Sequence, residues 1–293
     1  EDDITRAAVQ LGTAGATLDT ITVRSTESSS IETLAGAFGA GGTAGIGAAI
    51  NVNLLFGQTI AAMSIADEQT SNVSGNVLVQ ANQSGSIRTL AASLGAGGTA
   101  GVAGSIVVNV FDRKIQGLIT STVDDGDADV TVLNTDGGDV TVDVNQSGLI
   151  EAFAGAVGAG GTAGVGVAFT ISVQGDDASA TVENVQINTA KTTPISASNL
   201  LADAGNISIT ANNEIDIDAI AVSLGGAGTV GVGGSFAISV AESTVKTIVK
   251  RAVLTARDVT LTSGAANALN AYGGSVAGGG AAAVSIGIAT NVS

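Results

Sequence analysis

Large apolar residues alternate with small or amide-bearing residues along the longest uncharged parts of this chain. Every second residue from Ile46 to Leu54 is apolar, and the positions between them include Ala49, Asn51 and Asn53. The alternation returns at residues 102–110, 165–173 and 232–240. A period of two is typical of β-strands, because successive side chains point to opposite faces of a sheet. Val, Ile and Thr are frequent in these segments, which also favours strands over helices.

These alternating segments carry no charge on either face. A strand with one face in water normally shows charged or strongly polar residues at alternate positions. We therefore expect both faces to be buried. The bulky face is expected to fill a core, and the smooth face to pack closely on another sheet of the same chain or of a neighbouring molecule.

A pattern of 23 residues occurs five times, beginning at Thr20, Asn76, Asp139, Asn206 and, more weakly, Asp258. Successive copies are offset by 52 to 67 residues, and the length varies in the polar stretches between them. Such repetition predicts stacked copies of one supersecondary unit. The sequence therefore predicts an all-β, Gly/Ala-rich, β-solenoid-like fold of about five imperfect units in a single repetitive domain, 1–293. The units are roughly 20–75, 76–138, 139–205, 206–257 and 258–293, and residues 1–19 are expected to complete a unit.

Each unit is interpreted as four parts. A short strand is followed by a polar bend such as 82–85, by two apolar strands around a glycine-rich segment, and by a further alternating strand such as 59–66. We assign packing and assembly to the glycines of these segments: Gly39, Gly41, Gly42, Gly95, Gly97, Gly98, Gly158, Gly160, Gly161, Gly225, Gly226 and Gly228. The first residues resemble the strand that would follow the last residues, which is expected of a window on a longer repeat or of head-to-tail polymerisation.

Composition narrows the classes of function. The net charge is −16, so nucleic acid is not an expected partner, since phosphate binding requires clustered Lys and Arg. The chain has no Cys and no His, which excludes disulfides, thiolate chemistry, histidine metal sites and Ser-His-Asp catalysis. Aromatic residues are only 2%, which disfavours a carbohydrate-active site, and we expect no enzyme activity. The uncharged stretch 33–66 could span a bilayer as a helix, but its glycines and its period of two predict no membrane span.

One acidic cluster has a spacing that suits calcium. Asp125, Asp127 and Asp129 lie at alternate positions around a glycine-bearing turn, and Ca²⁺ binds six to eight oxygen ligands. A solvated turn that ends a strand is the alternative, so calcium is a possible ion and no other cofactor is expected.

Other recurrent polar residues have structural interpretations beside functional ones. Thr43, Thr99, Thr162 and Thr229 occupy equivalent places and are expected to hydrogen-bond their own turns, although ice or sugar binding is an alternative. Asn51, Asn53 and Asn109 could form an amide ladder, which the serine of the fourth copy would interrupt. Glu32, Arg88, Glu151 and Asp218 share one repeat position, interpreted as a bend or a sheet edge.

The string GAGGTAG, followed by VGVAFTISV or VAGSIVVNV and preceded by a DVTV-type strand, resembles repeats of large secreted bacterial filamentous adhesins of the leukotoxin-like or haemagglutinin-like kind. The resemblance covers nearly the whole chain. It implies an elongated β-solenoid on the surface of a Gram-negative-type cell, although no two-partner secretion signal domain is visible. The predicted function is that of a structural protein of an extracellular filament, with self-association as the partner interaction. The alternative is an adhesin-type module that displays loops to a host surface or glycan.

Overall fold

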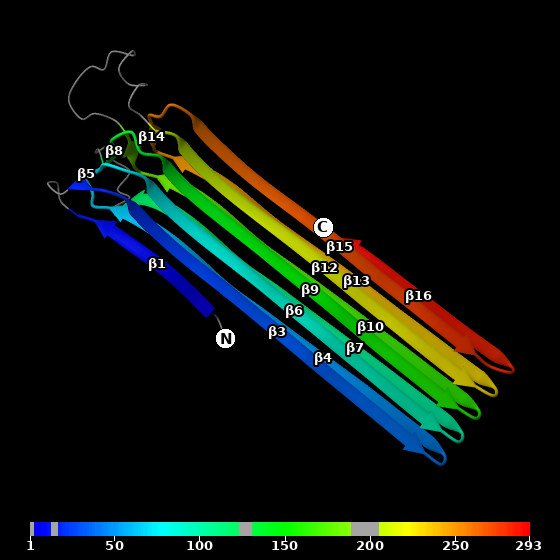
Figure 1. Ribbon diagram of the computed structural model, residues 1–293. Helices are drawn as coiled ribbons and strands as arrows, with labels where there is room; N and C mark the ends of the chain where they lie inside the picture. Colours follow the sequence, from blue (N-terminus) through cyan, green and yellow to red (C-terminus); the bar gives the residue numbers. More distant parts are fainter. Residues whose placement is uncertain (1–2, 13–16, 123–130, 189–204) are drawn as a thin grey trace.

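The computed structural model describes residues 3–12, 17–122, 131–188 and 205–293. It is an all-β solenoid whose five repeats stack as parallel strands in three sheets (Figure 1). One turn of the chain, which we call a coil, passes through a short strand and then two long ones. The predicted fold class is therefore confirmed.

Sheet A contains β1 (Asp3–Leu11), β4 (Ala44–Ile65), β7 (Ala100–Ser121), β10 (Ala163–Glu183), β13 (Val230–Lys250) and β16 (Ala282–Val292), in that order. Sheet C contains β3 (Ile21–Gly41), β6 (Val77–Gly97), β9 (Val140–Gly160), β12 (Ile207–Ala227) and β15 (Val259–Gly278). Sheet B contains the short strands β2 (Thr17–Leu18), β5 (Thr70–Val73), β8 (Val132–Thr135), β11 (Gln186–Ile187) and β14 (Val253–Leu254).

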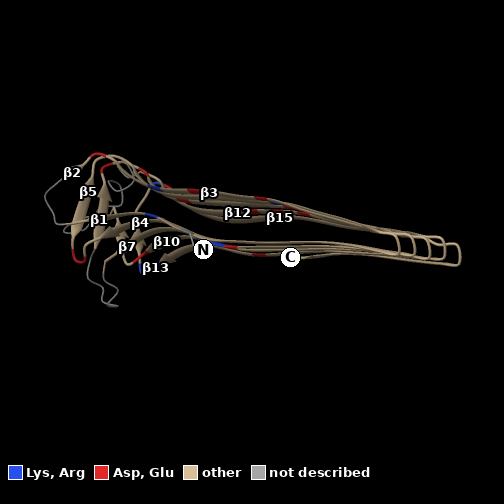
Figure 2. Cartoon of the chain, turned by 90° about the horizontal axis from the view of Figure 1, so that it is seen from below, with Lys and Arg blue, Asp and Glu red and all other residues tan. Residues whose placement is uncertain are grey.

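The register between coils follows the sequence repeat. Gly39 pairs with Gly95, Gly95 with Gly158, and Gly158 with Gly225. Sheets A and C face each other as the two sides of a long arm, and a two-residue turn such as Gly42-Thr43 joins them at its tip. Sheet B closes the opposite, wider end, so that the arm narrows from sheet B to the tip (Figure 2).

The size of the inward side chains decreases along the arm. At the sheet B end the interior is filled by Val, Ile, Leu and Met, including Val79, Ile119 and Leu133. Further along it consists mostly of Ala, with Phe111 and a few isoleucines, and at the tip of Gly. Because side-chain volume determines how far apart two packed sheets lie, this gradient accounts for the wedge shape.

The orientation of the two strand faces differs from the sequence expectation. The smooth face does pack on another sheet of the same chain, since Ala49 is 3% exposed. The bulky face points outward instead of filling the core, and Ile50 is 63% exposed. Next to the tip, the short turn holds sheets A and C too close together for branched aliphatic side chains to fit between them, whereas Val107, further along, does fit inside and is 0% exposed.

We call the outward apolar part of sheet A the aliphatic face. It consists of Ile46, Ala48, Ile50, Val52, Leu54, Val102, Gly104, Ile106, Val108, Val110, Val165, Val167, Phe169, Ile171, Val173, Val232, Gly234, Phe236, Ile238, Val240, Val284, Ile286, Ile288, Thr290 and Val292.

Two further expectations about strand boundaries were wrong. The segment 82–85 is not a bend but lies within the 21-residue strand β6, and residues 59–65 are not a separate strand but continue β4 to its end. The strands of sheet B were missed, because two to four residues are too few to show a period.

Candidate functional site

Glycines near the tip allow sheets A and C to approach backbone to backbone. A Cβ atom built on Gly158 would overlap the carbonyl oxygen of Val165 on the opposite strand of the same coil. The same overlap occurs for Gly39, Gly95 and Gly225 against Ile46, Val102 and Val232, and for Gly41, Gly97 and Gly160 against Ala44, Ala100 and Ala163. These positions need glycine because of the close approach, since none of them has a positive φ.

A second set of glycines contacts the neighbouring coil. A Cβ on Gly98, Gly161 or Gly228 would overlap the carbonyl oxygen of the turn glycine in the preceding coil. Gly42, in the first tip turn, and Gly226 have open space around the Cβ position. Gly226 faces outward, and Ala227 holds the register position of Gly160, so Gly226 makes no such packing contact.

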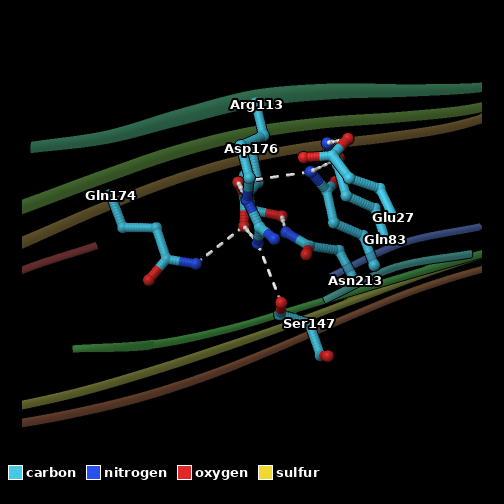
Figure 3. A network of polar contacts seen from close by, with 9 residues as sticks. Glu27, Gln83, Arg113, Ser147, Gln174, Asp176 and Asn213 are labelled. Atoms are coloured by element: carbon cyan, nitrogen blue, oxygen red, sulfur yellow. Dashed lines mark hydrogen bonds and ion pairs between the residues drawn. The ribbon is translucent and has the colours of Figure 1, made fainter. Parts of the chain in front are cut away.

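The interior also contains a buried polar network where the arm widens (Figure 3). Gln83 Nε2 donates to Glu27 Oε2 at 2.8 Å, and Thr59 Oγ1 donates to the same oxygen at 2.6 Å. Gln146 Nε2 donates to Gln83 Oε1 at 3.1 Å and to Asp176 Oδ1 at 3.2 Å. The network therefore joins three consecutive coils of sheet C and reaches across to sheet A.

An ion pair between two coils lies at the centre of this network. Arg113 Nη2 is 3.2 Å from Asp176 Oδ2, and both side chains are 0% exposed. Arg113 also donates to the carbonyl of Ser147 at 2.9 Å, and its guanidinium lies 3.9 Å from the centre of the Phe111 ring. Gln174 Nε2 donates to Asp176 Oδ2 at 2.7 Å.

Burial dominates the electrostatics of this pair. Desolvation raises the pKa of Asp176 above its usual range, against the attraction of Arg113. Desolvation likewise lowers the pKa of Arg113, against the attraction of Asp176. The facing strand leaves room for the large side chains, because a Cβ on Gly148 would overlap Gln174 and one on Gly85 would collide with Phe111.

This pair was not predicted from the sequence, although the repeat contains the signal. Arg113 and Asp176 are 63 residues apart and occupy the same register position, which Gly57 and Ser243 hold in the flanking coils. A buried charge pair of this kind penalises any shift between coils, since a shift would leave an unpaired charge inside.

A smaller buried cluster lies nearer the tip. Asn53 Nδ2 donates to Thr89 Oγ1 at 2.7 Å and to Asn109 Oδ1 at 2.9 Å, and Thr89 Oγ1 donates to Asn109 Oδ1 at 3.0 Å. Asn51 does not join this cluster, because it shares its register position with Val107 and donates to the carbonyl of Leu90 at 3.2 Å. Ser172 and Ser239 hold the position of Asn109 in the next two coils, so the amide ladder spans only two coils.

The outer face of sheet C carries a charged row. Arg88 Nε is 2.7 Å from Glu151 Oε2 and Arg88 Nη1 is 3.9 Å from Glu32 Oε1, and Asp218 extends the row. These residues lie in mid-strand, so their interpretation as a bend or edge position was wrong. In the same region, partial burial, followed by repulsion from Asp218, Glu214 and Glu151, raises the pKa of Asp216.

A polar groove of about 550 Å³ crosses the same outer face nearer to sheet B. Its floor includes an amide ladder in which Asn145 Nδ2 donates to Asn82 Oδ1 at 3.4 Å and Asn212 Nδ2 donates to Asn145 Oδ1 at 3.2 Å. Glu214 and Ser147 also line it. Amide and carboxylate groups at regular spacing can hydrogen-bond to the hydroxyls of a polar ligand.

The remaining sequence candidates lie at the tip or outside the described residues. Thr43, Thr99, Thr162 and Thr229 form an exposed row in successive tip turns. Coil-to-coil backbone bonds connect them, for example from the Thr162 amide to the Thr99 carbonyl at 2.8 Å. Asp125, Asp127 and Asp129 lie outside the described residues. Within the described part of the chain, no three acidic side chains converge as a metal site would require.

No family model, no curated protein and no solved structure matches this chain. In the ranges that the structure describes, no helix is long and apolar enough to cross a membrane.

The tip glycines generate a first prediction. Gly158→Ala should lower the free energy of unfolding by roughly 3 kcal/mol, because overpacking against backbone cannot be relieved by a rotamer change. Gly104→Ala is the matched control, since Gly104 has open space at its Cβ position. The control should be neutral or slightly stabilising, because Gly is less favourable than Ala in a strand. Urea denaturation of both variants measures the difference, and equal midpoints would contradict the account.

The buried ion pair generates a second prediction. Arg113→Met should destabilise the chain by about 3–5 kcal/mol at pH 7, because it leaves the Asp176 carboxylate buried and unpaired. Asp176 has a raised pKa, so its contribution to stability is present below the unfolded-state value and is lost as pH rises through the folded value. The cost of Arg113→Met should therefore shrink as pH falls toward about 4.

The double variant Arg113→Met/Asp176→Leu is the control for this pair and should recover most of the lost stability, since it leaves no buried charge. A single variant that costs under about 1 kcal/mol, or a cost that grows at low pH, would show that the pair is not desolvated as described. Urea titrations across this pH range measure both quantities.

Proposed function

We propose that this chain is a structural repeat segment of an extracellular filament or cell-surface fibre. The observation that carries the proposal is the continuity of register. Every long strand of sheets A and C pairs with the equivalent strand of the next coil without a bulge or a slip. Stability in such a solenoid accumulates along the axis, as a fibre requires.

The chemistry of the chain supports a mechanical function over a catalytic one. Arg113 and Asp176, whose pKa values are shifted by burial, are sealed between sheets A and C and bonded to each other. Their arrangement fits alignment of coils, so we propose no enzyme activity and no cofactor. The acidic balance fits a surface that stays soluble between assembly steps.

Location at the cell surface is part of this proposal and rests on the resemblance to secreted adhesin repeats together with the solenoid fold. Antibodies against the chain should label intact producing cells, and protease treatment of intact cells should remove the label. Electron micrographs should show filaments carrying it. Label that appears only after permeabilisation would contradict the proposal.

A variant pair connects these filaments to coil stacking. Gly161→Val would place a side chain against the carbonyl of Gly98 in the preceding coil, so labelled filaments should be lost. Gly226→Val is the control, because Gly226 faces outward from sheet C near the tip with open space at its Cβ position, and it should leave them intact. Filaments that survive Gly161→Val would show that they do not depend on the stacked coils.

The polar groove on sheet C favours one second candidate, an adhesin-type module for a host surface or glycan, with calcium as a possible stabiliser. Its amide ladder repeats coil by coil, as a polymeric polar ligand would. Glycan-array binding that is lost in Asn145→Ala, or on calcium chelation, would support it. Filaments that persist after calcium chelation and bind no glycan on the array would favour the structural function.

A further inference from the structure

The aliphatic face is an extended apolar surface that the described fold leaves uncovered. It occupies eleven residues of each sheet A strand, such as Ala44–Leu54, across five coils. With about 3.3 Å per residue and about 4.8 Å per strand, it measures about 36 Å by about 24 Å. The resulting area of about 850 Å² matches one side of a standard protein–protein interface and exceeds the patches usual on monomers.

The centre of this face consists of large apolar and aromatic side chains, as the core of a protein–protein interface does. Its middle row is Ile50, Ile106, Phe169, Phe236 and Ile288. The rings of Phe169 and Phe236 stack with centroids 4.8 Å apart and planes 6° from parallel. In protein–protein interfaces, the residues that contribute most of the binding energy are often large apolar and aromatic side chains near the centre of the contact.

Charge is excluded from the face and returns at its border. No Asp, Glu, Lys or Arg occurs in residues 33–66, 89–111, 152–175, 219–241 or 259–293, and Figure 2 shows the tip side of the arm free of charge. The first charged outward positions toward sheet B are Asp112 and Glu242, which share one register row.

From these features we propose that the aliphatic face binds the same face of a second copy of this chain, with the two arms pointing in opposite directions. This contact rests on the proposed filament function and would be the lateral contact within the filament. Opposed arms place each acidic row against the uncharged tip of the partner, whereas arms in the same direction would bring Asp112 and Glu242 of both copies together.

The geometry of this pairing suits a fibre. The two-fold axis that opposes the arms is parallel to the direction of coil stacking, so both copies stack their coils the same way. Each coil then faces the equivalent coil of its partner at the same spacing, and the contact extends with every coil. The wedge shape also fits, because two opposed wedges make a pair with parallel outer sides (Figure 2).

Sedimentation velocity of the 293-residue chain at about 150 mM salt tests the pairing. The wild-type chain should be a dimer at micromolar concentration. Ile50→Lys/Ile106→Lys should raise the dissociation constant at least 100-fold, because it buries two charges from each copy in the contact. The matched control is Leu34→Lys/Leu90→Lys, which adds the same charges in the same two coils on the outer face of sheet C, and it should remain dimeric.

Cross-linking tests the opposed arrangement. The chain has no cysteine, so Val102→Cys and Val110→Cys give unique reactive sites at opposite ends of the face. A short bismaleimide should join a Val102→Cys copy to a Val110→Cys copy and should not join Val102→Cys copies to each other.

A monomeric wild-type chain, or a control variant as monomeric as the face variant, would overturn the inference. So would insertion of the tip into phosphatidylcholine vesicles by a chain that stays monomeric in solution, which would identify lipid as the occupant. A dimeric chain on cells without filaments would instead remove the proposed function and leave this contact standing. Filaments formed by a monomeric chain would instead remove this contact and leave the proposed function standing.

Discussion

The close approach of two backbones at the tip is the constraint on which the rest of this structure depends. Two residues link sheet C to sheet A in the first four coils and three in the fifth, so the sheets meet with almost no room between them. Only Gly, Ala and Ser fit the inward positions there, and Gly158 already lies against the carbonyl of Val165. Every larger apolar residue near the tip must then point outward, which creates the aliphatic face.

The opposite end of the arm obeys the same rule with larger side chains. Sheet B spreads sheets A and C apart, and Ile119, Leu133 and their neighbours fill the wider space. Between the two ends, the gap is too wide for alanine and is filled by Arg113, Asp176 and the glutamines. Their pairing is satisfied in only one alignment of the coils. Apolar packing thus supplies stability along the arm, and the buried charge pair supplies specificity of register.

Much of this architecture was predictable from the chain alone. The period of two gave the strands, and the repeat gave the number of coils and their register, because Gly39, Gly95, Gly158 and Gly225 pair as the copies align. The inner face was not predicted, since hydrophobicity alone favours Ile50 over Ala49 for the core. The length of the tip turn decides this choice, and it becomes visible only when the two strands are placed face to face.

The candidate site was predictable to a lesser degree. Most glycines assigned to packing do contact backbone. Gly226 was grouped with them on residue type alone, but it faces outward from its strand and makes no such contact. Arg113 and Asp176 were hidden because each stands next to another charged residue and resembles a solvated segment. Comparing residues at one register position across coils, as with Gly57, Arg113, Asp176 and Ser243, would have revealed the pair.

The packing of the whole arm depends on which face of the long strands is inside, and cysteine accessibility measures this directly. The chain has no native cysteine, so Leu90→Cys and Ala91→Cys each provide one thiol at adjacent positions of β6. In the folded chain, a maleimide should label Leu90→Cys rapidly and leave Ala91→Cys protected until urea unfolds it. Rapid labelling of Ala91→Cys with protection of Leu90→Cys would contradict the account, because the bulky face would then form the core.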